Sequence, residues 1–113
     1  MKLNQVVCYL QNMDQVVAFK KQGITEVIVE TKEFSKLGKN TISECIQLAQ
    51  KAKDTGLEPV FNWDLLLDDN QLEHCQKLFK QITSGVFSAV RVQDLGAAYW
   101  LKNNFPQLAI HLI

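Results

Sequence analysis

Several polar residues lie within short apolar, β-branched stretches of the sequence or directly follow them. Successive residues of a strand point to opposite faces of a sheet, so each stretch can be sorted into two sets. One set is apolar and suited to packing under helices: Val27, Val29, Phe61, Trp63, Val90, Val92, Ile110 and Leu112. The other set carries the groups that could do chemistry: Glu30, Asn62, Asp64, Arg91, Gln93 and His111. Four stretches therefore place carboxylates, amides, a guanidinium and an imidazole on one common face.

These polar groups fall near the carboxyl ends of the predicted strands, which is the edge where α/β folds bind ligands. Two interpretations stay open. In the first, Glu30 and Arg91 form a pair, and Asn62, Gln93 and His111 bridge them or contact a ligand. In the second, the groups satisfy one another as a buried polar layer, since buried polar groups need hydrogen-bond partners. His111 alone is more typical of a core hydrogen-bonding residue than of a ligand-binding one.

Well-known catalytic and nucleotide-binding motifs do not occur in the sequence. It contains no G-x-G-x-x-G, Walker A or G-x-S-x-G pattern, and its Cys and His residues never fall at zinc-site spacing. No Ser/His/Asp or Cys/His arrangement is recognisable. Asp64 occupies the position of a receiver-domain phosphoacceptor, but the first strand ends in Leu10, Gln11 and Asn12, without the acidic residues that such a domain needs. We therefore predict no metal site in this chain and leave the catalytic residues unassigned.

Strands and helices alternate along the chain. Strands are predicted over residues 6–10, 27–30, 59–64, 88–93 and 109–113, and helices over residues 13–21, from Thr41 until Gly56, from Asp68 or Asp69 through Ile82, and over about 96–104. Thr41 and Glu44 have the spacing of a capping box, and Gly23 and Gly56 are placed to end helices.

The segment 31–40 between the second strand and the second helix is polar and carries three lysines: Lys32, Lys36 and Lys39. We expect it to be a solvated loop. Contact between these lysines and an anionic substrate is the alternative.

Single helices between successive strands predict parallel β-α-β units with right-handed crossovers. Both a doubly wound sheet and a (β/α) barrel satisfy this pattern. The last predicted strand runs to Ile113, whereas a doubly wound domain usually adds a covering helix there. We therefore expect residues 1–113 to form one α/β domain that is a piece of a longer protein.

The composition is that of an ordinary soluble globular chain. Hydrophobic residues make up 47% and charged residues 21%, and 12 basic residues balance 12 acidic ones. No net field attracts the chain to nucleic acid or to an anionic membrane, and no apolar run approaches the roughly 18 residues of a membrane span. Three widely separated cysteines, Cys8, Cys45 and Cys75, indicate reduced thiols in a cytoplasmic protein.

Three stretches carry a resemblance to a known family. Residues 33–40 (EFSKLGKN) resemble the loop after strand two in U32 proteins, the "collagenase-like peptidases". Residues 91–97 (RVQDLGA) are similar to the strand-four motif of that family, with Leu95 where the family usually has proline. Residues 104–112 (NFPQLAIHL) resemble its FP-x-x-x-I-H-L approach to strand five. The order and spacing of these pieces match along essentially the whole chain.

The resemblance implies the N-terminal half of a TIM-like barrel. Family members are described as peptidases, and several resemble enzymes that use an iron–sulfur cluster to hydroxylate RNA bases or ubiquinone precursors. The signature cysteines of the family lie beyond the region matched here, so Cys8, Cys45 and Cys75 are not expected to be cluster ligands. We therefore expect no cofactor in this chain, and RNA enters as a partner by family analogy only.

The sequence thus predicts the substrate-side part of a U32 protein, catalytically incomplete by itself. The residues expected to line its mouth are Gln11, Glu30, Asn62, Asp64, Arg91, Gln93 and Asp94. The alternative is a self-contained α/β binding or interaction module without catalysis.

A half-barrel also predicts self-association. Its first and last strands have unpaired backbone groups, and its open face exposes apolar residues such as Ile28 and Ile113 that the missing half would cover. We expect a homodimer or larger form with contacts from the open barrel face or from the edge strands near Cys8 and Ile110, and no contact with membranes.

Overall fold

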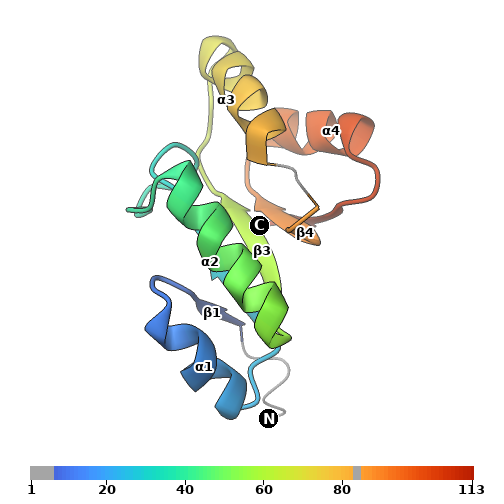
Figure 1. Ribbon diagram of the computed structural model, residues 1–113. Helices are drawn as coiled ribbons and strands as arrows, with labels where there is room; N and C mark the ends of the chain where they lie inside the picture. The colour runs from blue at the N-terminus through green and yellow to red at the C-terminus, as the bar shows by residue number, and fades with distance from the viewer. Residues whose placement is uncertain (1–6, 83–84) are drawn as a thin grey trace.

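Five parallel strands form one sheet in the computed structural model, which describes residues 7–82 and 85–113 (Figure 1). The strands are β1 (Val7–Tyr9), β2 (Glu26–Val29), β3 (Glu58–Trp63), β4 (Ala89–Val92) and β5 (Ala109–Leu112). Each strand pairs in parallel with the next one along the chain, so the order is β1-β2-β3-β4-β5. The predicted α/β class and the five strands are confirmed.

One helix connects each pair of strands: α1 (Asp14–Lys21), α2 (Ile42–Thr55), α3 (Asp69–Ile82) and α4 (Leu95–Asn104). Figure 1 shows α1 and α2 side by side against the sheet, and these two helices contact each other. All four helices contribute side chains to the core cluster that includes Val27, Phe61 and Val90. No helix within the described residues is long and apolar enough to cross a membrane.

Strand order decides between the two closures that the sequence left open. A doubly wound sheet reverses its strand order and carries helices on both faces. Here the order never reverses, and every helix packs on the face of Phe61, Trp63 and Val92. The open sheet is therefore consistent with part of a (β/α) barrel.

The helix ends follow the predicted local signals. The Thr41 side chain accepts from the Glu44 amide, and Glu44 accepts in turn from the Thr41 amide, which confirms the capping box. Gly56 ends the same helix in the left-handed conformation, with φ 95°. At the start of α3 the cap is Asp68, since its Oδ1 accepts from the Gln71 amide at 2.8 Å.

The loop over residues 31–40 differs from the predicted solvated loop. Phe34 is fully buried and packs edge-on against Trp63 and Phe61, with ring centroids 4.8 and 5.1 Å apart. Thr31 and Ser35 are buried as well. The polar composition of the loop gave no sign of this burial. Burying the Phe34 ring among other aromatic rings contributes more free energy than ordering the loop costs in conformational entropy. The three lysines are exposed as expected, and Leu37 is exposed beside them.

The second face of the sheet carries no helix of residues 7–82 and 85–113, and its burial differs from the prediction at one position. Ile113 is 49% exposed, as expected for this open face, but Ile28 is only 3% exposed. Ile28 lies beside Tyr9 in the β1–β2 register, and the Arg91 side chain reaches the Tyr9 hydroxyl from β4. These two long side chains shield Ile28 from solvent.

The buried aromatic ring of the loop yields a stability prediction. Phe34→Ala should lower the free energy of unfolding by about 3–5 kcal/mol, because it leaves a cavity among Phe61, Trp63 and Phe79. Leu37→Ala is the matched control in the same loop: Leu37 is 82% exposed, so its change should stay within about 0.5 kcal/mol. Denaturant unfolding of both variants measures the difference, and equal losses would contradict the loop anchoring.

Candidate functional site

One buried amide holds two carboxylates at the carboxyl ends of β2 and β3. Asn62 is 0% exposed. Its Nδ2 donates to Glu30 Oε2 at 2.8 Å and to Asp64 Oδ2 at 3.2 Å. Three of the residues predicted for the mouth are therefore brought together in one network, which fixes the two acids relative to each other.

The loop after β2 fixes Asp64 from the other side. The Lys36 amide donates to Asp64 Oδ1 at 3.0 Å, and the Asp64 amide donates to the Phe34 carbonyl at 3.1 Å. The Ser35 hydroxyl donates to the Asn62 carbonyl at 2.8 Å. Because both carboxylate oxygens of Asp64 accept hydrogen bonds, its side chain is ordered before any ligand arrives.

Gly38 allows this loop to close on itself. A β-carbon at this position would overlap the carbonyl oxygen of Thr31, so only glycine permits the close approach. The loop also ties its two ends together, since the Lys32 amide donates to the Asn40 carbonyl at 3.0 Å.

The two carboxylates line an open hollow of about 410 Å³, together with Tyr9, Gln11 and Leu37. Gln11 is exposed at its edge, and its backbone N–H donates to Gln15 Oε1 at 2.7 Å. Lys39 lies at a neighbouring, smaller hollow that also includes Gln11 and Glu30. The arrangement presents fixed acceptors, with a lysine nearby, to a ligand of modest size.

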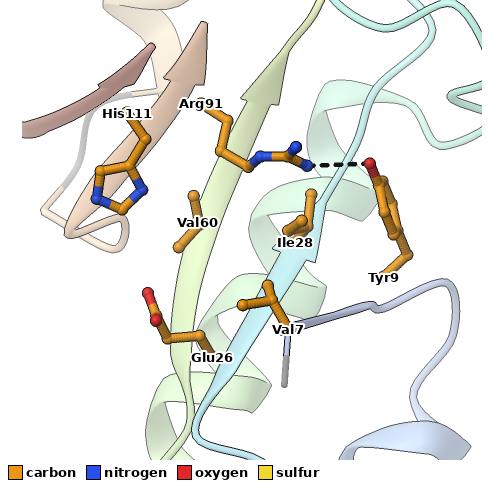
Figure 2. A pocket seen from close by; sticks show the side chains of 7 residues that line it. All are labelled: Val7, Tyr9, Glu26, Ile28, Val60, Arg91 and His111. Atoms are coloured by element: carbon orange, nitrogen blue, oxygen red, sulfur yellow. Dashed lines mark hydrogen bonds between the residues drawn. The ribbon is translucent and has the colours of Figure 1, made fainter. Parts of the chain in front are cut away.

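Arg91 lies in a second hollow of about 300 Å³ on the same open face, where its Nη1 donates to the Tyr9 hydroxyl at 3.0 Å (Figure 2). The hollow is lined by Val7, Tyr9, Glu26, Ile28, Val60, Arg91 and His111. The pair between Glu30 and Arg91, which belonged to one of the two interpretations left open by the sequence, does not form. Glu30 is hydrogen-bonded to Asn62, while Arg91 extends toward β1 and bonds to Tyr9. The salt bridge found among the described residues is Lys77–Glu73.

The remaining predicted residues have separate positions. Asp94 caps α4: its Oδ2 accepts from the Ala97 amide at 2.9 Å and its Oδ1 from the Leu67 amide at 3.4 Å. Gln93 is exposed directly after β4, and His111 is exposed on β5, in register with Arg91. Asp94 thus orders the α4 terminus and the segment before α3, which leaves it few free acceptor sites.

Sequence reasoning missed Tyr9 and Ser35. Sorting the first strand by parity would have placed Tyr9 on the polar face, because Cys8 faces the helices and Tyr9 alternates with it. No sequence signal marks Ser35, whose contact with β3 depends on how the loop folds.

The buried thiols are poor nucleophiles. Burial raises the pKa of Cys45 to about 12, with further upward contributions from the Glu33 and Glu30 charges. Burial and the Glu33 charge also raise the pKa of Cys75. Both thiols therefore stay protonated at neutral pH. In residues 7–82 and 85–113 no group of three or more His, Cys, Asp or Glu side chains could hold a metal ion.

The Asn62 network yields a pH prediction. Asn62→Asp removes both N–H donors and buries a third carboxyl beside Glu30 and Asp64. The pKa of the introduced carboxyl rises above its unfolded value, because burial and like charges favour the neutral form. The folded variant then binds more protons than the unfolded one, so its loss of stability grows as the pH rises and shrinks as the pH falls.

Urea unfolding between about pH 5 and pH 8 measures this difference from the unsubstituted chain. Asn70→Asp, at an exposed position of α3, is the control and should show no comparable pH dependence. Parallel pH profiles for the two variants would contradict the shared-amide geometry.

Comparison with known proteins places the chain in one family. The family model described as Peptidase family U32 matches residues 8–113, which is nearly the whole sequence. No curated protein and no solved structure matches the chain. The matched region includes β2 to β5, all of β1 except Val7, the loop that fixes Asp64, and every lining residue of both hollows except Val7. The chain belongs to peptidase family U32.

Proposed function

We propose that this chain is the substrate-side part of a U32 protein and binds its ligand at the carboxyl ends of β2 and β3. The observation that carries the proposal is the buried Asn62 amide, which holds Glu30 and Asp64 at the edge of the hollow. Ligands of α/β folds bind at this edge. Asp64 is ordered on both oxygens, so ligand binding need not immobilise it.

The proposed ligand is a peptide, in keeping with the family to which the chain belongs. The carboxylates of Glu30 and Asp64 can accept hydrogen bonds from peptide N–H groups or from a basic side chain. Gln11 and Gln93 are exposed nearby and offer amide donors and acceptors. RNA hydroxylation is the second chemistry that the resemblance implies, but two acids at the hollow repel a polyanion.

We further propose that the chemical step needs residues other than those described. The raised pKa values of the buried Cys45 and Cys75 thiols argue against either one as a nucleophile, since a thiolate is the attacking species. The cysteines also do not fit an iron–sulfur cluster, whose ligands are thiolates that converge on one point. Cys8, Cys45 and Cys75 come instead from β1, α2 and α3. Their free state supports a cytoplasmic location.

The rival proposal is a self-contained binding module without catalysis. Its support is the covered face, where the four helices and the sheet already share one continuous core. The two proposals predict different activities for a protein that contains this chain and further sequence. Peptide cleavage that requires both this chain and further sequence supports the first, and peptide binding that never leads to cleavage supports the second.

The proposal predicts binding without turnover. The 113-residue chain should retain immobilised gelatin peptides and should leave gelatin and casein uncleaved. Asp64→Ala should weaken retention about tenfold or more, because it removes a fixed charged acceptor. Asp54→Ala, at an exposed position of α2, is the matched control. Cleavage that Asp64→Ala abolishes would show that the chain is itself catalytic, and equal retention by both variants would remove the proposed site.

We also propose that the chain self-associates through the β5 edge. An apolar hollow of about 230 Å³ lies there between α4 and β5, lined by Ala98, Tyr99, Lys102, Ile110 and Leu112. Tyr99 and Leu112 are among its most exposed large apolar side chains. A second copy is the proposed occupant, because a two-fold axis pairs one such patch with itself, and unpaired edge strands invite β-pairing.

Light scattering across a dilution series tests the association. The apparent mass should fall on dilution, and Leu112→Asp should shift the fall to higher concentration. Leu66→Asp, at an equally exposed site before α3, should leave the dilution curve unchanged. A monomer at every concentration, or the same effect from both variants, would contradict the β5 interface.

A further inference from the structure

Arg91 differs from the other basic residues of the chain in its side-chain chemistry and in its surroundings. It is the only arginine, and every other basic side chain is a lysine or a histidine. It is half-buried on β4, and no carboxylate of the described residues lies within 4.0 Å of it. A guanidinium differs from an ammonium in its planar fork of five N–H donors, which matches a carboxylate in a bidentate pair. The guanidinium of Arg91 therefore has N–H donors that could still pair with the carboxylate of a ligand.

Tyr9 fixes where the guanidinium points. Its hydroxyl accepts from Arg91 Nη1 at 3.0 Å, and Arg91 Cζ lies 6.0 Å from the centre of its ring. Figure 2 shows the Arg91 side chain extended across the sheet to Tyr9, with Ile28 beside the bridge. The Tyr9 contact uses one donor, so the other N–H groups remain for a ligand in the hollow of about 300 Å³.

We infer that this hollow is a carboxylate subsite, in which Arg91 binds the ligand's carboxylate and Tyr9 positions the guanidinium. Ile28, Val60 and Val7 supply an apolar wall for the carbon body next to that carboxylate. This inference rests on the proposed ligand-binding role of the open face and names a chemical group that the ligand should carry.

Charge favours a single carboxylate over a polyanion. Glu26 lines the same hollow, and Glu30 and Asp64 line the neighbouring one, with Tyr9 shared between the two. One guanidinium balances one negative charge, whereas a phosphate dianion or a nucleic acid would bring further negative charge toward these carboxylates. The other basic side chain that lines this hollow is His111. A small apolar monocarboxylate, such as the terminal residue of a peptide, fits both the charge and the lining.

Because Arg91 is the only arginine, its side chain can be followed without ambiguity. In the 113-residue chain labelled with ¹⁵N-arginine, the guanidinium Nε–Hε signal belongs to this residue alone. Benzoate should shift that signal saturably, with a Kd in the millimolar range that is ordinary for a fragment. Benzamide, which has the same shape without the charge, should leave it in place, and inorganic phosphate should bind more weakly than benzoate.

Three variants test the assigned roles, one of them as a control. Arg91→Lys keeps the charge but loses the fork, and benzoate binding followed through backbone amide shifts near Ile28 and Val60 should weaken about tenfold. Tyr9→Phe keeps the ring but loses the hydroxyl, and should weaken binding several-fold while the free Arg91 signal moves. Tyr99→Phe, at an exposed position of α4, is the matched control and should change neither. Circular dichroism confirms that each variant is folded.

The unsubstituted chain alone can overturn the inference. A benzoate titration without a saturable Arg91 shift, an equal response to benzamide, or tighter binding of phosphate would each do so. So would unchanged benzoate binding in folded Tyr9→Phe. If gelatin peptides bind, their retention depends on Asp64 and the Arg91 signal does not respond to benzoate, only the carboxylate subsite is wrong. If benzoate binds at Arg91 but gelatin peptides do not bind, the subsite stands and the proposed peptide role fails.

Discussion

The sequential order of the five parallel strands is the constraint on which the rest of the structure depends. Each right-handed crossover leads to the next strand along the sheet, so each helix is carried to the same face. The apolar residues of the strands and helices meet there in one core. The opposite face is left without helices in the part of the chain that the structure describes, and polar side chains can approach one another and solvent there. A reversal of strand order at any point would have covered it.

The loop between β2 and α2 turns that open face into a defined site. Phe34 inserts into the aromatic core, and this anchors Ser35 and Lys36 against the end of β3. The anchoring costs the loop its conformational freedom, which burial of the aromatic ring offsets. The anchored loop holds the Asp64 carboxylate in place, since both of its oxygens accept hydrogen bonds. Stability and site geometry are coupled in this loop, since the residue that fills the core also places the backbone that orders the acid.

Tyr9 separates two regions of opposite character on the open face. On one side lie the carboxylates of Glu30 and Asp64, bridged by Asn62, and on the other lies the guanidinium of Arg91. Direct pairing of Glu30 with Arg91 would have neutralised both groups and left little for a ligand. The neutral amide and the neutral phenol satisfy them instead, so each keeps most of its charge available.

The sequence by itself determined the elements and their faces. Period-two alternation identified β2 to β5 and assigned Val27, Phe61 and Val90 to the covered side, because a buried strand face must be apolar. Local signals at Thr41 and Gly56 placed the ends of the second helix, since capping depends only on neighbouring residues. At the third helix the sequence left Asp68 and Asp69 open, and the structure identifies Asp68 as the cap.

Only the tertiary structure decided which polar groups meet. Arg91 bonds to Tyr9, 82 positions away along the chain, and Asn62 bonds to Glu30, 32 positions away. Such partners depend on strand order, on the curvature of the sheet and on side-chain reach, none of which parity encodes. The buried Phe34 loop was hidden for the same reason: a polar segment looks solvated until the core that receives its one aromatic residue has been assembled.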